Sequence, residues 1–87
     1  MPDILMYVRE TCPYCHRARG LLRAKGARWT EVDIDLEPTR RAEMIEKSGR
    51  NTVPQIFIGP LHVGGSDDLD ALDQGGQLDP LLGEAGT

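Results

Sequence analysis

Two cysteines separated by two residues are the feature of this 87-residue chain most suited to chemistry. They form the motif Cys12-Pro13-Tyr14-Cys15 and are the only cysteines in the sequence. A pair this close cannot join distant segments, which excludes a disulfide-rich scaffold and fits a reducing compartment. Such a pair can exchange between a dithiol and a disulfide. The motif therefore predicts thiol–disulfide redox chemistry.

The elements around the motif give the two cysteines different roles. Residues 4–8 form an apolar run typical of a buried strand, and residues 13–25 are predicted to be a helix with Pro13 in its first position. Cys12 then lies at the helix N-terminus, where free backbone N–H groups favour a thiolate, and Arg9 adds positive charge upstream. Cys15 lies one turn further in, nearer the core, and is expected to be less acidic and less exposed. We expect Cys12 to attack disulfides and Cys15 to resolve the mixed disulfide.

The cysteine pair has two other interpretations, half of a zinc site or two inert buried cysteines. A zinc site needs further ligands, and the remaining candidates are His16, His62 and carboxylates, without a second cysteine pair. The Pro-Tyr insert at a strand–helix junction argues against inert cysteines. Redox chemistry is therefore favoured, and no metal ligand is predicted.

The rest of the chain alternates strands and helices. Strands are predicted at residues 28–34, 55–58 and 61–63, and helices at 38–49 and from 66, with a last helical turn at 78–82 and a frayed end at 83–87. The apolar side chains expected to face the core are Trp29, Val32, Ile34, Ala42, Ile45, Leu69 and Leu72. The order β-α-β-α-β-β-α predicts one α/β domain over residues 1–87, with the cysteines at the carboxyl end of the first strand.

Two later segments carry further signals, each with two interpretations. Pro54 precedes a strand and cannot donate to its ladder. It is either a turn proline or forms a cis bond that turns the Val53 backbone outward, toward an extended peptide. In the segment 64–68, Ser66 or Asp67 caps the following helix, or the amino end of that helix binds a carboxylate.

Charge is unevenly spread along the chain. Residues 1–29 carry six basic and two acidic side chains, whereas residues 30–87 carry four basic and twelve acidic ones, for a net charge of −4. The basic segment is either a set of solvated helix faces or a field that attracts anionic partners to the cysteines. The acidic balance argues against nucleic-acid binding, and no apolar run predicts a membrane span. Residues 1–7 lack a secretory signal pattern, so a cytoplasmic location is expected.

Three segments together resemble the dithiol glutaredoxins, most of all the small bacterial glutaredoxin 3 type: residues 11–15, 52–58 and 64–69. The resemblance covers roughly residues 4–82. It implies a thioredoxin fold, a four-stranded mixed sheet flanked by three or more helices, with Pro54 in the cis form. It also implies glutathione as cosubstrate, no permanently bound cofactor, and glutathionylated or disulfide-containing proteins as clients of a monomer. Cys12 and Cys15 would be the catalytic residues, and the glutathione-binding residues would be Arg9, Tyr14, Thr52, Val53, Pro54, Gly65, Ser66 and Asp67.

The charges of glutathione fit that assignment, since the tripeptide carries two carboxylates and one ammonium. Arg9, where the family usually has Lys, would meet the glycyl carboxylate, and Asp67 would meet the ammonium. The Val53 backbone would pair with the cysteinyl unit. Ser66 stands where some relatives carry a third cysteine.

Two competing functions fit parts of the same pattern. One is a redoxin of the same fold that is reduced by thioredoxin reductase, against which the predicted glutathione-binding residues argue. The other is a dimeric carrier of an iron–sulfur cluster, ligated by Cys12 and glutathione. Relatives with that function usually replace Pro13 by a small residue, so Pro13 and Cys15 argue against it.

Overall fold

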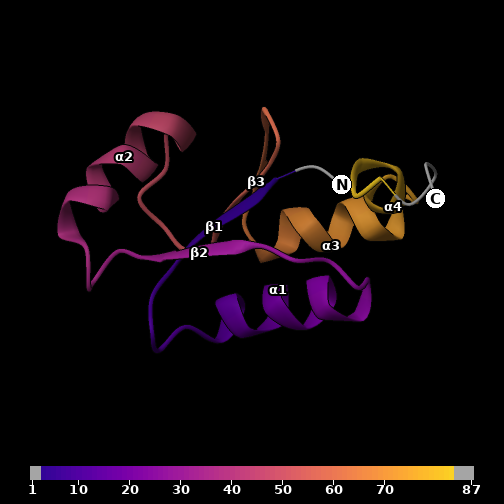
Figure 1. The fold of residues 1–87 in the computed structure, drawn as a ribbon, viewed down its shortest axis with the longest axis horizontal. Coiled ribbons are helices and arrows are strands. Elements are labelled where there is room, and N and C mark those ends of the chain that lie inside the picture. Colours follow the sequence, from indigo (N-terminus) through magenta and orange to yellow (C-terminus); the bar gives the residue numbers. More distant parts are fainter. Residues whose placement is uncertain (1–2, 84–87) are drawn as a thin grey trace.

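The computed structural model describes residues 3–83, so the predicted frayed end lies outside the described residues except for Gly83. The elements follow the predicted order (Figure 1): β1 Ile4–Val8, α1 Pro13–Ala24, β2 Thr30–Asp33, α2 Pro38–Ser48, β3 Gln55–Ile58, β4 Leu61–Gly64, α3 Ser66–Gln74 and α4 Leu78–Leu81. None of the helices within residues 3–83 has both the length and the apolar character needed to cross a membrane.

One mixed sheet with the strand order β2-β1-β3-β4 forms the centre of the structure. The strand β1 runs parallel to β2 and antiparallel to β3, and β3 and β4 form an antiparallel hairpin. The strand β2 is shorter than the predicted 28–34. Its ladder runs from Thr30, opposite Leu5, to Asp33, opposite Val8, which is the last residue of β1.

Helices cover both faces of the sheet, α1 and α3 on one and α2 on the other (Figure 1). Successive residues of β1 point to opposite faces, so Met6 joins the larger core beneath α1 and α3, whereas Tyr7 joins the smaller core beneath α2. Of the apolar residues predicted to face the core, Val32, Ile34 and Leu69 are buried, and Trp29, Ile45 and Leu72 are partly buried.

Helix α2 corrects one prediction, because Ala42 is exposed and Met44 is the residue that is fully buried. At about 100° of rotation per residue, Ala42 lies about 200° around the helix from Met44, on the solvent side. Next to Met44, the helix also makes a polar contact that apolar spacing does not reveal. The Tyr7 hydroxyl donates to the carboxylate of Glu43, which also accepts from Arg40 at 3.0 Å. Burial and the neighbouring Glu43 raise the pKa of Tyr7 to about 12.

Candidate active site

Cys12 occupies the N-cap of α1, as predicted. It has extended backbone angles, φ −137° and ψ 104°, and Pro13 begins the helix. Its sulfur accepts a hydrogen bond from the backbone N–H of Cys15, with an N-to-Sγ distance of 3.2 Å. The first turn of α1 thus directs one of its free N–H groups at Cys12 Sγ, an arrangement that favours negative charge on the sulfur.

Cys15 lies inside the larger core and differs from Cys12 in the way the sequence predicts. Its side chain is completely buried, whereas Cys12 retains 7% of its surface. Burial, and after it the hydrogen bond with Cys12, raise the pKa of Cys15 to about 12. Near neutral pH Cys15 is therefore a protonated thiol, shielded from solvent and adjacent to the more accessible sulfur.

The segment before β3 lies against Cys12. The Val53–Pro54 peptide bond is cis, as the resemblance implied. Cys12 Sγ lies 3.9 Å from the carbonyl oxygen of Val53, although the two residues are 41 positions apart in the chain. The cysteine motif and the proline segment therefore form one site.

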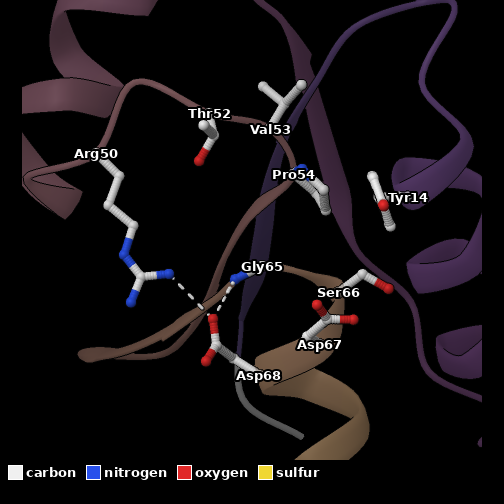
Figure 2. A pocket seen from close by; sticks show the side chains of 9 residues that line it. All are labelled: Tyr14, Arg50, Thr52, Val53, Pro54, Gly65, Ser66, Asp67 and Asp68. Carbon is white, nitrogen blue, oxygen red and sulfur yellow. Dashed lines mark hydrogen bonds and ion pairs between the residues drawn. The ribbon is translucent and has the colours of Figure 1, made fainter.

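A pocket of about 200 Å³ opens beside this contact (Figure 2). Tyr14 lies on one side of it and Arg50 on the other, with the start of α3 below. Its lining consists of Tyr14, Arg50, Thr52, Val53, Pro54, Gly65, Ser66, Asp67 and Asp68. Seven of the eight residues predicted to bind glutathione lie in this lining, while Arg9 does not.

Arg9 is exposed and points to a different partner. Its guanidinium donates to both carboxylate oxygens of Asp35, at 3.1 and 3.2 Å. Three other basic side chains of residues 1–29, those of Arg17, Arg19 and Lys25, also pair with carboxylates from later in the chain. These ion pairs weaken any positive field around the cysteines. Arg50, which the sequence analysis missed, is the arginine that lines the pocket itself.

The N-terminus of α3 corrects the predicted cap. Gly65 is the N-cap residue, and its N–H donates to Asp68 Oδ2 at 2.9 Å, so neither Ser66 nor Asp67 is the capping side chain. Asp68 also accepts from Arg50 at 3.0 Å, and the Gly65 N–H followed by Arg50 lowers the pKa of Asp68. Its position three residues after the N-cap is the signal that would have identified it.

Ser66 carries a buried hydroxyl group without a hydrogen-bond partner in the described part of the chain. Its side chain is 4% exposed, and its hydroxyl has no hydrogen-bond partner among residues 3–83. Buried hydroxyl groups normally find a partner, so Ser66 is an exception at the start of α3, in a residue that also lines the pocket.

The histidines considered as zinc ligands have other partners. His16 Nδ1 contacts Arg19 at 3.1 Å, and His62 Nε2 contacts Gln55 at 2.7 Å. Within residues 3–83, no three His, Cys, Asp or Glu side chains gather as a metal site requires.

Comparison with known proteins decides the family. A glutaredoxin family model matches residues 4–63. Glutaredoxin 3 of Escherichia coli K12 is 57% identical over 82 residues, which cover 94% of this chain and 99% of that protein. The chain belongs to the glutaredoxin family. The resemblance predicted from the three segments is thus confirmed.

Solved glutaredoxin structures confirm the thioredoxin fold. A buckwheat glutaredoxin–glutathione complex superposes with a TM-score of 0.87 at 32% identity, over 95% of this chain and 78% of that one. The solution structure of Brucella melitensis glutaredoxin gives 0.83 at 58% identity, over 94% and 89% of the two chains. As a glutaredoxin, the chain belongs to a family of thiol oxidoreductases that use glutathione as cosubstrate.

Proposed function

We propose that this glutaredoxin reduces protein–glutathione mixed disulfides and protein disulfides, with Cys12 as nucleophile and Cys15 as resolving thiol. One observation supports this most directly. Cys12 Sγ, which accepts the first-turn N–H, lies 3.9 Å from the Val53 carbonyl oxygen, and Val53 lines the pocket. A disulfide whose glutathione half occupied the pocket would bring its sulfur next to Cys12. We further propose that the protein acts as a monomer in the cytoplasm.

The pocket offers glutathione complementary groups along its length. The backbone of Val53 can pair with the cysteinyl unit, flanked by Tyr14, Thr52 and Pro54. The γ-glutamyl end meets the start of α3, where Ser66 provides a backbone N–H group, whereas the Gly65 N–H is already bonded to Asp68. The exposed carboxylate of Asp67 meets the ammonium.

Positive charge around the site comes from two arginines in this proposal. Arg9, at the cysteine end of the site, is assigned to the glycyl carboxylate, although its guanidinium is bonded to Asp35 without ligand. Arg50 lines the pocket and adds charge there, part of which Asp68 neutralises.

In the first route, the Cys12 thiolate attacks the glutathione sulfur of a mixed disulfide. The client's sulfur–sulfur bond breaks, the client leaves as a thiolate that takes up a proton, and Cys12 carries glutathione. The thiolate of a second glutathione then attacks the bound glutathione sulfur. Oxidised glutathione leaves and the Cys12 thiolate is restored. Cys15 takes no part in this route.

In the second route, the Cys12 thiolate attacks an intramolecular disulfide of a client, which leaves Cys12 joined to the client. Cys15 loses its proton as it attacks Cys12 Sγ, and the client leaves as a reduced dithiol. The Cys12–Cys15 disulfide is then reduced by two molecules of glutathione, which become oxidised glutathione. The second sulfur lies one helical turn from the first, within reach without movement of another element.

A coupled assay tests the proposal. The protein is given a glutathionylated peptide, glutathione and glutathione reductase, and NADPH consumption is followed. We expect turnover that depends on glutathione and disappears in Cys12→Ser. The same substrate with thioredoxin reductase in place of glutathione and its reductase should give no turnover. Turnover supported only by thioredoxin reductase would overturn the proposal in favour of another redoxin.

A further inference from the structure

Gln55 is a fully buried polar residue directly after the cis proline. It is the first residue of β3 and lies opposite Tyr7 on β1. Its side chain therefore projects from the face of the sheet that α2 covers, behind the pocket. Buried amides persist where their hydrogen-bonding groups are satisfied, so the partners of Gln55 indicate its role.

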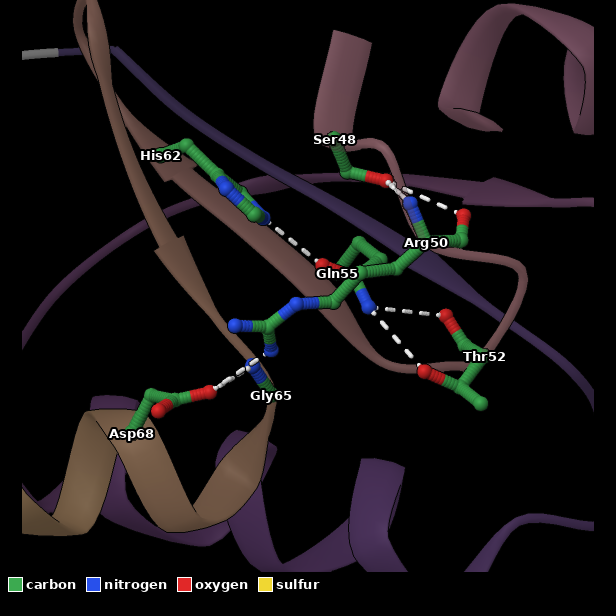
Figure 3. A network of polar contacts seen from close by, with 7 residues as sticks. All are labelled: Ser48, Arg50, Thr52, Gln55, His62, Gly65 and Asp68. Atoms are coloured by element: carbon green, nitrogen blue, oxygen red, sulfur yellow. Dashed lines mark hydrogen bonds and ion pairs between the residues drawn. The ribbon is translucent and has the colours of Figure 1, made fainter. Parts of the chain in front are cut away.

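Both ends of the Gln55 amide are bonded (Figure 3). Its Nε2 donates to the backbone carbonyl oxygen of Thr52 at 3.0 Å and to Thr52 Oγ1 at 3.2 Å. Its Oε1 lies 2.7 Å from Nε2 of His62. Because a backbone carbonyl can only accept, the nitrogen of the amide must face Thr52, and Oε1 must accept from His62. His62 therefore carries a proton on Nε2.

The surroundings of His62 hold its ring in place and favour its neutral form. His62 is on β4, opposite Phe57 on β3, and its ring stacks on the Phe57 ring with centroids 4.9 Å apart and planes tilted by 31°. Burial, and after it the charge of Arg50, lower the pKa of His62, which favours the neutral ring at neutral pH. The β3–β4 hairpin thus positions His62, and His62 in turn bonds the side chain of Gln55.

The bond from Gln55 to Thr52 determines how the next backbone group points. In a planar trans peptide the C=O and N–H bonds point in opposite directions. The Thr52 carbonyl turns back toward Gln55, so the N–H of Val53 in the same peptide unit turns away from Gln55, toward the pocket that Val53 lines.

We propose that Gln55, held by His62, is a positioning residue that fixes the Thr52–Val53 peptide unit so that the Val53 N–H faces bound glutathione. The inference rests on the proposed function, in which the cysteinyl unit of glutathione pairs with the Val53 backbone. Gln55 touches neither glutathione nor the reacting sulfurs. It sets the direction of one donor, and loss of that direction weakens binding without altering Cys12.

Three variants separate this role from general loss of structure. Gln55→Glu keeps the size and the acceptor but removes both N–H donors to Thr52. His62→Phe keeps an aromatic ring over Phe57 but removes the donor to Gln55, while His62→Gln retains an N–H donor. Thermal melts show which variants are folded, and if Gln55→Glu does not fold, the two His62 variants carry the comparison.

Two measurements are made on each folded variant. The dissociation constant of S-methylglutathione, an unreactive analogue, is measured by NMR with the Val53 amide signal as reporter. The KM for glutathione and kcat come from the coupled assay, and reduction of hydroxyethyl disulfide by dithiothreitol reports Cys12 without glutathione. We expect Gln55→Glu to raise both the dissociation constant and the KM about tenfold with kcat nearly unchanged. His62→Phe should also raise the dissociation constant and the KM. His62→Gln should bind the analogue more tightly than His62→Phe does.

The outcomes are distinguishable. A dissociation constant unchanged in Gln55→Glu, or an equal loss in the dithiothreitol reaction, overturns the positioning role. Wild-type protein that neither binds the analogue nor uses glutathione overturns the proposed function instead. In that case the positioning role is judged on the Val53 amide alone. Its chemical shift and hydrogen exchange change in Gln55→Glu if Gln55 fixes the peptide, and match the wild type if it does not.

Discussion

The backbone N–H of Cys15 donates to the sulfur of Cys12 across 3.2 Å, so the residue proposed to resolve the mixed disulfide also favours negative charge on the proposed nucleophile. This bond comes from the backbone and is kept whatever side chain stands at position 15. The side chain of Cys15, in contrast, is completely buried. The two cysteines can therefore be separated by mutation, because the support that residue 15 gives Cys12 does not depend on its thiol.

Cys15→Ser is expected to keep reduction of glutathionylated substrates while reduction of intramolecular disulfides falls by at least about tenfold, since the mixed disulfide with Cys12 has no resolving thiol. The measurement compares a glutathionylated peptide with a protein that carries one internal disulfide. Cys12→Ser is the matched control and should lose both activities. Loss of both activities in Cys15→Ser would contradict the assigned division of labour.

Alkylation should distinguish the two thiols by pH. Iodoacetamide reacts with thiolates, and a thiol with a pKa of about 12 is ionised to only about one part in ten thousand at pH 8. Mass spectrometry of the reduced protein at pH 8 should therefore find one modified cysteine, Cys12. Cys12→Ser should be modified only at a pH above that of an ordinary thiol, because burial, the main cause of the raised pKa of Cys15, is kept in this variant. Labelling of Cys12→Ser with a midpoint near pH 9 would show that Cys15 is accessible and that its thiol has an ordinary pKa.

Asp67 and Asp68 are adjacent, but replacement of Asp67 by alanine should affect glutathione binding, whereas replacement of Asp68 should affect stability. Asp67→Ala should raise the KM for glutathione several-fold with unchanged stability, since its exposed carboxylate is assigned to the ammonium. Asp68→Ala should lower the free energy of unfolding by about 1 kcal/mol, because Gly65 loses its capping partner. Urea unfolding and glutathione kinetics on both variants check the contrast. Similar effects of the two substitutions on both measurements would leave Asp67 without a binding role.

The cost of Asp68→Ala should also depend on pH. The native structure lowers the pKa of Asp68 below its ordinary 3.8, so the unfolded chain binds the proton more tightly. The stability that this carboxylate contributes is then fully present above about pH 5 and is lost as the pH falls through the native pKa. The difference between wild type and Asp68→Ala should be constant from pH 5 to 8 and shrink in acid. A difference that grows in acid would contradict the lowered native pKa of Asp68.

Much of the fold could be predicted from local patterns, because these elements carry their own boundary signals. Pro13 and Pro38 begin helices, and the apolar run at residues 4–8 forms the buried central strand. Ala42 was assigned to the core because apolar spacing alone was used to orient α2. The face that is buried carries Met44, and the neighbouring Glu43 bonds Tyr7, which lies 36 residues away and which no local pattern connects to it.

In the candidate site, too, features with a local motif could be predicted, whereas contacts between distant residues could not. The cysteine pair, the proline segment and the start of α3 could be predicted because each has a local motif. Arg9 was assigned on charge and position, but its partner Asp35 lies 26 residues away and turns it out of the pocket lining. His62, which the sequence presents only as a candidate zinc ligand, bonds the buried Gln55 across a hairpin. Side-chain partners that depend on tertiary contacts are the part that the sequence could not show.

Gly64 should tolerate a side chain less well than Gly26, another glycine with a positive φ. Its φ is +114°, and a Cβ there would lie 2.9 Å from Asp68 Cγ, whereas a Cβ at Gly26, with φ +71°, would meet nothing within 4 Å. Gly26→Ala should therefore lower the free energy of unfolding by about 1 kcal/mol, from backbone strain alone. Gly64→Ala should cost about 3 kcal/mol, because it also displaces the carboxylate that caps α3.

A double-mutant cycle measured by urea unfolding separates the two contributions at Gly64. In an Asp68→Ala background the carboxylate is already absent, so adding Gly64→Ala should cost only about 1–2 kcal/mol of backbone strain. The cost of Gly26→Ala should be the same with or without Asp68. If Gly64→Ala cost as much in the Asp68→Ala background as in the wild type, the close approach of Gly64 to Asp68 would have no part in holding the start of α3, and backbone strain would account for the whole effect.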